Sequence, residues 1–338
     1  MCKRAFLAGV IGCGVALLSA PAALASTATI TGTSTVRVAG EGSESNTITI
    51  GYVPASDTYV ITDASSNLGK SGSACVQVDT RTVTCPGAGI KTISVDTGNG
   101  SDLIILDRQT IPTSIEGNLD GGGGNDLVSG GRGKDDVSGG SGNDILDPKE
   151  GADDINGGSN TDTLLYDTRT TPVFVTIGAT NGNDGNEQDQ TGLVRDTVHG
   201  DVEAVTGTLG PDFVVGDNSG ETLNGAEGND FLFGQGGADT LLGFGGDDFL
   251  SGGAGGDVAL GLIGNDRLLG GPDGDRLVGG PDNDVIKGKK GSDAMSGRAG
   301  IDKILAKDHT RDVKINCGSG AGERAKFDKG TDPKPKSC

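Results

Sequence analysis

The chain has 338 residues, of which 63 are glycine, 11 are proline and only 11 are aromatic, so an ordinary globular core and a collagen-like helix are both poor fits. Its 27 Lys and Arg against 47 Asp and Glu leave a formal charge of -20, which argues against nucleic-acid binding. A chain this acidic and this rich in glycine would be disordered unless a further interaction offset its charge repulsion and backbone entropy.

The first 25 residues have the pattern of a secretory signal peptide. A basic start that includes Lys3 and Arg4 precedes an apolar segment, and an A-x-A sequence lies directly before Ser26. The apolar segment is shorter than the roughly 20 residues that a membrane span requires. Residues 10–13 resemble a lipoprotein signal, and whether Cys13 is lipidated stays open. We therefore expect a secreted or cell-surface protein without a membrane span, whose mature charge is -20 - 2 = -22.

Four cysteines remain after residue 25, which in an exported protein indicates two disulfides with three possible connectivities. Residues 75–85 alternate like a hairpin centred on Thr80, so we predict a Cys75–Cys85 disulfide. Cys317 and Cys338 would then close a C-terminal cap and stabilise it by about 3 kcal/mol.

Residues 26–95 form a predicted small N-terminal β module. Alternating segments at 34–38, 47–52, 58–62, 76–79 and 82–85 predict its strands. Residues 64–71 fit a loose phosphate-loop pattern, but an apolar strand and not a helix follows them, so we interpret them as a polar turn.

A nine-residue period dominates the rest of the chain. One unit occupies residues 97–105, five occupy 121–165, and eleven consecutive units occupy 207–305. Across these seventeen units the sixth position is Asp except at Glu221, and the eighth position is always apolar. A flexible linker would not keep an aliphatic residue at every ninth position, so the pattern predicts an ordered repeat.

The units resemble the hemolysin-type, or repeats-in-toxin (RTX), pattern G-G-x-G-x-D-x-U-x over 17 × 9 = 153 residues. The resemblance implies an all-β, right-handed parallel β-roll (a β-solenoid) in which six residues make a calcium-binding turn and three make a strand. Two units would form one coil, with the aliphatic residue at position eight pointing into a thin core. The family also includes secreted proteases and lipases, and its toxins use a C-terminal export signal. The N-terminal signal makes this chain more similar to secreted bacterial calcium-binding proteins.

Position six carries the predicted chemistry. Asp residues eighteen apart should lie on the same side of adjacent coils, where carboxylates and carbonyls from two turns can supply the six to eight oxygens that Ca²⁺ takes. Mg²⁺ fits less well because it demands strict octahedral geometry. Five repeats give three such pairs and eleven give nine, so at most 3 + 9 = 12 sites follow. The predicted metal ligands are Asp102, Asp126, Asp135, Asp144, Asp153, Asp162, Asp212, Asp230, Asp239, Asp248, Asp257, Asp266, Asp275, Asp284, Asp293 and Asp302.

The remaining segments complete the predicted organisation. Residues 96–165 form a first repeat region, residues 166–206 an insert with a longer strand at 172–177 and an acidic loop at 181–192, and residues 207–305 a second array. We expect one roll interrupted by an excursion, closed by a cap at 306–338. Phe213, Phe231 and Phe249 should stack at eighteen-residue intervals. We expect the insert or the N-terminal module to cover them, and an exposed patch for a partner is the alternative.

Signatures of catalysis are absent from the sequence. It contains neither HExxH nor G-x-S-x-G, and we interpret its two histidines, His199 and His309, as solvated loop residues. We therefore predict a non-enzymatic, calcium-dependent structural or adhesive protein whose partners are calcium ions and cell-surface components or another protein. The alternative is a secreted hydrolase with an unrecognised site in residues 26–95 or 166–206. The oligomeric state stays open.

Overall fold

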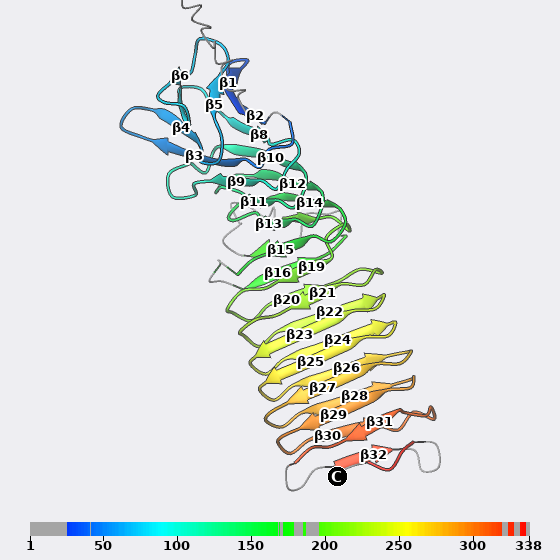
Figure 1. The fold of residues 1–338 in the computed structure, drawn as a ribbon. Coiled ribbons are helices and arrows are strands. Elements are labelled where there is room, and N and C mark those ends of the chain that lie inside the picture. The colour runs from blue at the N-terminus through cyan, green and yellow to red at the C-terminus, as the bar shows by residue number, and fades with distance from the viewer. Residues whose placement is uncertain are drawn as a thin grey trace, which may run out of the picture.

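The structure is a computed structural model that describes residues 26–40, 42–167, 169, 172–178, 185–186, 196–319, 324–327 and 332–335. In this part of the chain all regular secondary structure is β-strand (Figure 1). It contains no helix long and apolar enough to cross a membrane. The predicted signal peptide, residues 1–25, lies outside the described residues.

The strands form three sheets. In order across each sheet, sheet A contains β18 (Thr197–Val198), β14 (Asp154–Ser159), β12 (Asp135–Ser141), β10 (Glu116–Gly123), β8 (Thr92–Asp96), β2 (Thr35–Gly40), β1 (Ser26–Thr31) and β5 (Leu68–Lys70). Sheet B contains β31 (Lys314–Asn316), β29 (Ala294–Arg298), β27 (Arg276–Gly280), β25 (Val258–Ile263), β23 (Thr240–Gly245), β21 (Thr222–Asn224), β19 (Ala204–Thr206), β15 (Thr163–Leu165), β13 (Ile145–Asp147), β11 (Leu127–Ser129), β9 (Leu103–Leu106), β3 (Thr47–Val53), β4 (Thr58–Asp63), β7 (Thr82–Pro86) and β6 (Val76–Gln77). Sheet C contains β17 (Gly185–Asn186), β16 (Val173–Thr176), β20 (Phe213–Val215), β22 (Phe231–Gly236), β24 (Phe249–Ala254), β26 (Arg267–Gly271), β28 (Val285–Lys289), β30 (Lys303–Ala306) and β32 (Arg324–Phe327).

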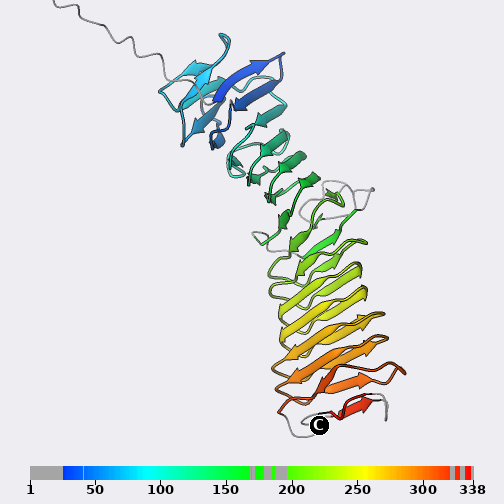
Figure 2. The same ribbon diagram turned by 45° about the vertical axis from the view of Figure 1, so that its right-hand side comes forward.

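The strand register confirms the eighteen-residue coil. Neighbouring strands in the arrays run parallel, and Val214 pairs with Leu232, which in turn pairs with Leu250. Successive units alternate between sheets A and B in the first array and between sheets B and C in the second, so two units complete one coil and each coil stacks on the one before it (Figure 2). The predicted parallel β-roll is therefore confirmed. Several strands exceed the three residues expected: β22 has six, because the first residues of the next unit also pair.

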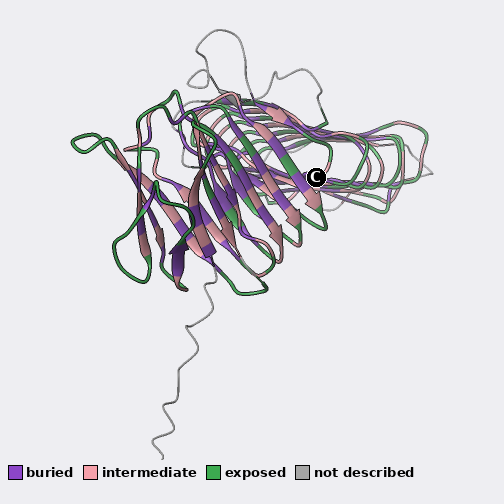
Figure 3. Ribbon diagram, turned by 90° about the horizontal axis from the view of Figure 1, so that it is seen from above, coloured by how far each residue is buried: buried purple, intermediate pink, exposed green. Residues whose placement is uncertain are grey.

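The core is one side chain thick. The aliphatic residues at position eight, such as Leu232, Leu250 and Leu268, are fully buried. Seen along the axis, inward and outward residues alternate along the strands while the turns are exposed (Figure 3). Two buried aliphatic side chains stabilise each coil by about 3–6 kcal/mol, which is little for eighteen ordered residues.

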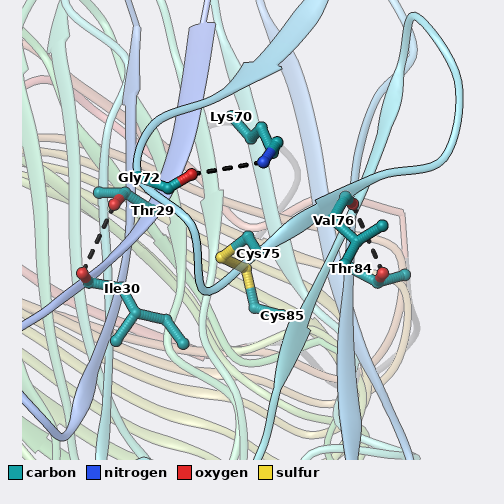
Figure 4. The surroundings of a disulfide bond; sticks show 8 residues. All are labelled: Thr29, Ile30, Lys70, Gly72, Cys75, Val76, Thr84 and Cys85. Atoms are coloured by element: carbon teal, nitrogen blue, oxygen red, sulfur yellow. Dashed lines mark hydrogen bonds between the residues drawn. A yellow bond between two sulfur atoms is a disulfide. The ribbon is translucent and has the colours of Figure 1, made fainter.

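The N-terminal module continues the two sheets of the roll. Strand β2 pairs in parallel with β8, and β3 pairs in parallel with β9, so the module covers the first coil. The hairpin of β6 and β7 and the Cys75–Cys85 disulfide are as predicted (Figure 4). The polar turn predicted for residues 64–71 is wrong at Leu68–Lys70, which pairs with β1 as strand β5. Cys317 is disulfide-bonded, whereas Cys338, its predicted partner, lies outside the described residues.

The roll changes one of its two faces at the insert. Sheet B runs continuously through β15, β19 and β21, whereas sheet A ends at β18 and sheet C begins at β16. Most of the predicted acidic loop, residues 181–192, lies outside the described residues. Sheet B is therefore continuous through the insert, while sheet C takes the place of sheet A opposite it.

The predicted phenylalanine ladder is present on sheet C. The ring centroids of Phe213 and Phe231 are 6.2 Å apart, those of Phe231 and Phe249 are 5.9 Å apart, and Phe174 extends the stack at 4.6 Å from Phe213. The Phe231 side chain is 48% exposed, and the N-terminal module, which was one predicted cover, lies at the far end of the stack (Figure 1). The rings therefore contact one another along the sheet, while the Phe231 ring remains partly exposed to solvent.

Candidate metal centre

The carboxylates at position six form three rows, one beside the start of the strands of each sheet. Row A contains Asp135, Asp153 and Asp196. Row B contains Asp102, Asp126, Asp144, Asp162 and Glu203, and after an interruption Glu221, Asp239, Asp257, Asp275, Asp293, Asp312 and Asp332. Row C contains Asp212, Asp230, Asp248, Asp266, Asp284 and Asp302.

One hydrogen bond joins each member of a row to the next. The backbone N–H of Asp230 donates to Oδ1 of Asp248 at 2.9 Å, and the N–H of Asp248 donates to Oδ1 of Asp266 at 3.0 Å. The same bond links Asp126 to Asp144 at 2.7 Å. Asp residues eighteen apart therefore lie on the same side of adjacent coils, as the repeat predicts.

The second oxygen of most of these carboxylates has no hydrogen-bond partner. Asp248, for example, is only 3% exposed, yet its Oδ2 accepts no hydrogen bond. A buried carboxylate oxygen without a partner is costly, so a cation or a proton is required there. The predicted ligands that share this feature are Asp102, Asp126, Asp144, Asp153, Asp162, Asp230, Asp239, Asp248, Asp257, Asp266, Asp275, Asp284 and Asp293.

Two of the predicted ligands are satisfied by the backbone instead. Asp135 accepts hydrogen bonds from the N–H groups of Gly117 and Gly131, and Asp212 accepts from those of Val173 and Thr208. Each of these residues stands first in its row, so its carboxylate takes the amides of an irregular turn. We expect them to be weaker metal ligands than the rest.

Glycine at position one leaves space beside most of the partnerless oxygens, whereas Thr97 and Pro148 occupy that position in the units of Asp102 and Asp153. A Cβ atom built on Gly121 would lie 2.6 Å from Oδ2 of Asp126 and 2.8 Å from the carbonyl oxygen of Gly139. At Gly139 the corresponding distances are 2.5 Å to Asp144 Oδ2 and 2.7 Å to the Gly157 carbonyl oxygen. The missing side chain thus opens a place where a carboxylate of one coil and a carbonyl of the next converge.

These places fit a hard cation that accepts backbone ligands. Among the described residues, no three carboxylate, imidazole or thiol side chains gather closely enough to hold a metal by themselves. A cation held here would therefore take one or two carboxylates and complete its shell with carbonyl oxygens. Ca²⁺ tolerates such irregular all-oxygen shells, whereas Mg²⁺ and transition metals do not favour them.

Burial makes the rows electrostatically unstable when no cation is bound. Desolvation, with a smaller contribution from the neighbouring carboxylates, outweighs the backbone hydrogen bond that each residue accepts and raises the pKa of Asp230 to about 8 and that of Asp248 to about 7. The same desolvation raises the pKa of Asp275 and Asp284 to about 7. Two uncompensated buried carboxylates per coil would cost several kcal/mol each, which is as much as the core of that coil contributes.

A buried arginine in the insert lies at the end of row A. Arg169, in the insert, is buried, lies 3.4 Å from Oδ2 of Asp196 and stacks its guanidinium 4.4 Å from the Tyr166 ring centroid. The Tyr166 hydroxyl also donates to Asp196 Oδ2 at 3.0 Å. Row A therefore ends on a fixed positive charge.

Five row members are absent from the predicted ligands. Asp196 and Glu203 come from the insert, Asp312 and Asp332 come from the tail, and Glu221 is the one Glu at position six of the repeats. Glu203 had a detectable signal: it lies nine residues before Asp212, with Val205 at position eight of the same register. The eighteen-residue spacing does not identify Asp312, because its coil has nineteen residues. The described part of the tail thus extends the roll by a further coil through β31 and β32.

A second ladder, at position five, was also missed. The side-chain oxygens of Asn229, Asp247, Asn265 and Asn283 each accept the N–H of position five in the following coil, at 2.7 to 3.1 Å. These residues are exposed, so the ladder links the turns of successive coils without contributing to the candidate metal site. In these units of sheet C, position five therefore uses an amide or carboxylate oxygen, and the amides show that no charge is needed.

The two histidines lie at the surface of the roll. His199 Nε2 lies 2.6 Å from Oδ1 of Asp154 on the solvent face of sheet A. His309 lies in the tail with a φ of 71°. Both are exposed, as the sequence interpretation expects.

The difference between Asp247 and Asp248 provides a test within one turn. In calcium, Asp248→Asn should bind one or two fewer ions and melt at a lower temperature, because the carboxylate that two coils share is lost. In EDTA the same substitution should raise stability, because it removes a buried charge that no cation balances. Calorimetric calcium titration and thermal unfolding measure both effects. Asp247→Asn is the control, since an amide serves equally well in the position-five ladder, and an identical result for the two variants would contradict the assignment.

Comparison with known proteins agrees with this geometry. The family model described as RTX calcium-binding nonapeptide repeat (4 copies) matches residues 117–146, 206–241, 215–250, 242–277 and 269–304. No curated protein matches the chain. The matched segments include most of rows B and C and the glycines beside them, so the resemblance to RTX repeats noted in the sequence is confirmed.

Proposed function

Because this chain carries RTX calcium-binding nonapeptide repeats on a parallel β-roll, we propose that it is an exported, non-enzymatic protein that folds when it binds calcium outside the cell. The observation that carries the proposal is the stack of buried carboxylate oxygens without a hydrogen-bond partner among the described residues, most of them beside a glycine that leaves room for an ion. The ions would be held between coils by the position-six carboxylates and the carbonyl oxygens of position one.

Charge balance supports folding on calcium binding. The estimate of up to twelve ions would bring +24 against the mature charge of -22. Bound Ca²⁺ would therefore remove the repulsion that opposes a compact state, and it would stabilise each coil by more than the thin core does. Since each ion would contact two coils, filling one site favours the next, so binding should be cooperative.

Export would separate synthesis from folding. The signal-peptide pattern in residues 1–25 and the Cys75–Cys85 disulfide both favour an oxidising compartment outside the cytosol. Calcium sites of extracellular modules commonly bind at about 10⁻⁴ to 10⁻³ M, so the repeats would stay empty in the cytosol and fill after export.

The role outside the cell would be structural or adhesive. The support is the shape, a long stack with a separate β module at its N-terminal end (Figure 2). The buried carboxylates are accounted for by the coils, which leaves no recognised acid and base pair for hydrolysis.

A calcium titration of the purified protein tests the proposal. Far-UV circular dichroism and hydrodynamic radius should change together in one cooperative transition, and equimolar Mg²⁺ should not produce it. The protein expressed with residues 1–25 should appear outside the cell, and a panel of ester, peptide and glycoside substrates should remain uncleaved in calcium and in EDTA. A spectrum that is identical with and without calcium, or calcium-dependent hydrolysis, would contradict it.

A further inference from the structure

The outer face of sheet C becomes cationic towards the C-terminal end. Its strands turn position eight inward, so positions seven and nine point to solvent. Between β16 and β32 these described outward positions hold no acid, although the chain as a whole is strongly acidic. Their cations, which we call the cationic face, are all exposed and form no ion pair among the described residues: Arg267, Lys287, Lys303, Arg324 and Lys326.

The cationic face places like charges next to one another. Lys303 on β30 lies directly opposite Arg324 on β32, and Leu305 lies opposite Lys326. A hollow of about 390 Å³ opens beside these cations and is also lined by Ile301. Like charges on directly opposed positions of neighbouring strands destabilise a sheet, so this arrangement has a cost that an anionic partner would remove.

The outer face of sheet A has the opposite character. Asp136 on β12 lies opposite Asp154 on β14, and Asp96 on β8 lies opposite Asp120 on β10. Among the described residues, one cation forms an ion pair on this surface, Arg37 at 3.7 Å from Asp96, and the imidazole of His199 lies 2.6 Å from Asp154. The five carboxylates, which we call the acidic face, are Asp96, Glu116, Asp120, Asp136 and Asp154.

The two faces belong to a molecule whose charge is separated along its length. Residues 26–260 carry 10 Lys and Arg against 35 Asp and Glu, a net charge of -25. Residues 261–338 carry 15 against 12, a net charge of +3, and six of those acids are the buried Asp266, Asp275, Asp284, Asp293, Asp302 and Asp312. The roll therefore presents an acidic surface in its first half and a basic surface at its end.

We propose that the cationic face of one copy binds the acidic face of a second copy, so that the protein assembles head to tail. Five cations meet five carboxylates, and both sets repeat at the same strand spacing of about 4.8 Å, which lets two charge ladders align. The faces lie at different levels of one stack, so they cannot meet within a copy (Figure 1). Because the contact joins two different surfaces, it leaves one of each free and generates open chains rather than a closed dimer.

The inference rests on the calcium-loaded roll of the proposed function, and the test separates the two. Sedimentation equilibrium is measured in saturating calcium at low and at high ionic strength, with circular dichroism confirming that the roll is folded. At low ionic strength the mean mass should rise with concentration beyond that of a dimer, and high ionic strength should dissociate the chains. A folded protein that stays monomeric at low ionic strength overturns the inference but leaves the calcium proposal standing.

Charge reversal identifies the surfaces. Lys303→Glu with Lys326→Glu, and separately Asp136→Lys with Asp154→Lys, should each weaken association about tenfold or more. A mixture of the two reversed proteins should associate, because each then offers the face that the other lacks. Lys290→Glu with Lys314→Glu, which lie on a turn and on sheet B, make the same change in net charge and should leave association intact. Equal weakening by this control would overturn the assignment.

A soluble polyanion is the competing occupant. Retention on a heparin column that the Lys303 and Lys326 reversal abolishes, combined with a monomeric wild type, would assign the cationic face to an anionic polymer and overturn self-association. Should the reversed proteins fail to fold, Lys303→Ala with Lys326→Ala gives the same comparison with a smaller change in charge.

Discussion

In excess EDTA, the metal-free protein should lose stability as the pH rises from about 4 to about 7. Burial raises the folded-state pKa values of many row carboxylates above the unfolded value of about 3.9, and those of Asp248, Asp275 and Asp284 to about 7. A raised carboxyl pKa means that the folded state binds protons more tightly than the unfolded state. The stabilisation is therefore present at low pH and is lost as the pH passes through the folded pKa values.

Calcium should reverse this behaviour at neutral pH. Saturating Ca²⁺ replaces the protons, so the roll should be fully folded at pH 8 in calcium and largely unfolded at pH 8 in EDTA. Calcium addition near pH 7 should also release protons into an unbuffered solution, because the carboxylates must ionise to bind the metal. Circular dichroism against pH, with and without calcium, measures the effect, and Mg²⁺ at equal concentration controls for ionic strength. Stability in EDTA that increased with pH would show that the buried carboxylates are not what destabilises the metal-free chain.

Gly243→Ala should abolish one candidate metal site and destabilise the calcium-loaded roll by about 3 kcal/mol or more. The added Cβ would point at Oδ2 of Asp248 and lie 2.7 Å from the carbonyl oxygen of Gly261, where the ion would bind. Neither oxygen can retreat without breaking the hydrogen bonds of the row. The measurements are calcium stoichiometry and unfolding by urea in calcium.

The adjacent residue provides the control. Phe244 has a φ of 71° and an exposed side chain, and Ala226 occupies the same position with the same φ in the preceding coil. Phe244→Ala should therefore change stability by no more than about 0.5 kcal/mol and keep the ion. A Gly243→Ala protein with unchanged stoichiometry would show that the metal lies elsewhere.

Much of the site could be predicted from the nine-residue period, because residues a constant number of positions apart occupy equivalent places in successive coils. An aliphatic residue at position eight must point inward, which sets the orientation of the strand and places position six at the end of the turn before it. For this reason Asp126 and Asp144, or Asp230 and Asp248, could be paired from sequence spacing alone. The pairing of Cys75 with Cys85 was predictable for the same reason, since strand alternation sets which residues face each other across a hairpin.

Prediction stopped where the period is broken. Asp196 reaches row A across an excursion of 43 residues after Asp153, and no spacing rule connects them. Asp312 follows Asp293 by nineteen residues instead of eighteen. The ladder at position five depends on hydrogen bonds between turns, and the consensus pattern does not specify the residue at position five. In each case the hydrogen-bond partner depends on which coil is adjacent in space, and the sequence spacing does not give this.

The amino-acid sequence by itself determined the coil: its length, its inward residues, its glycine turns and the alignment of its carboxylates, because each of these depends on contacts between residues a constant distance apart. Only the tertiary structure decided where the coil is interrupted, which sheet continues through the interruption, and which carboxylates keep a partnerless oxygen. It also decided that the outward cations gather on sheet C and the outward acids on sheet A. Those features depend on how many residues separate elements that meet in space, and outside the repeats that number is not constant.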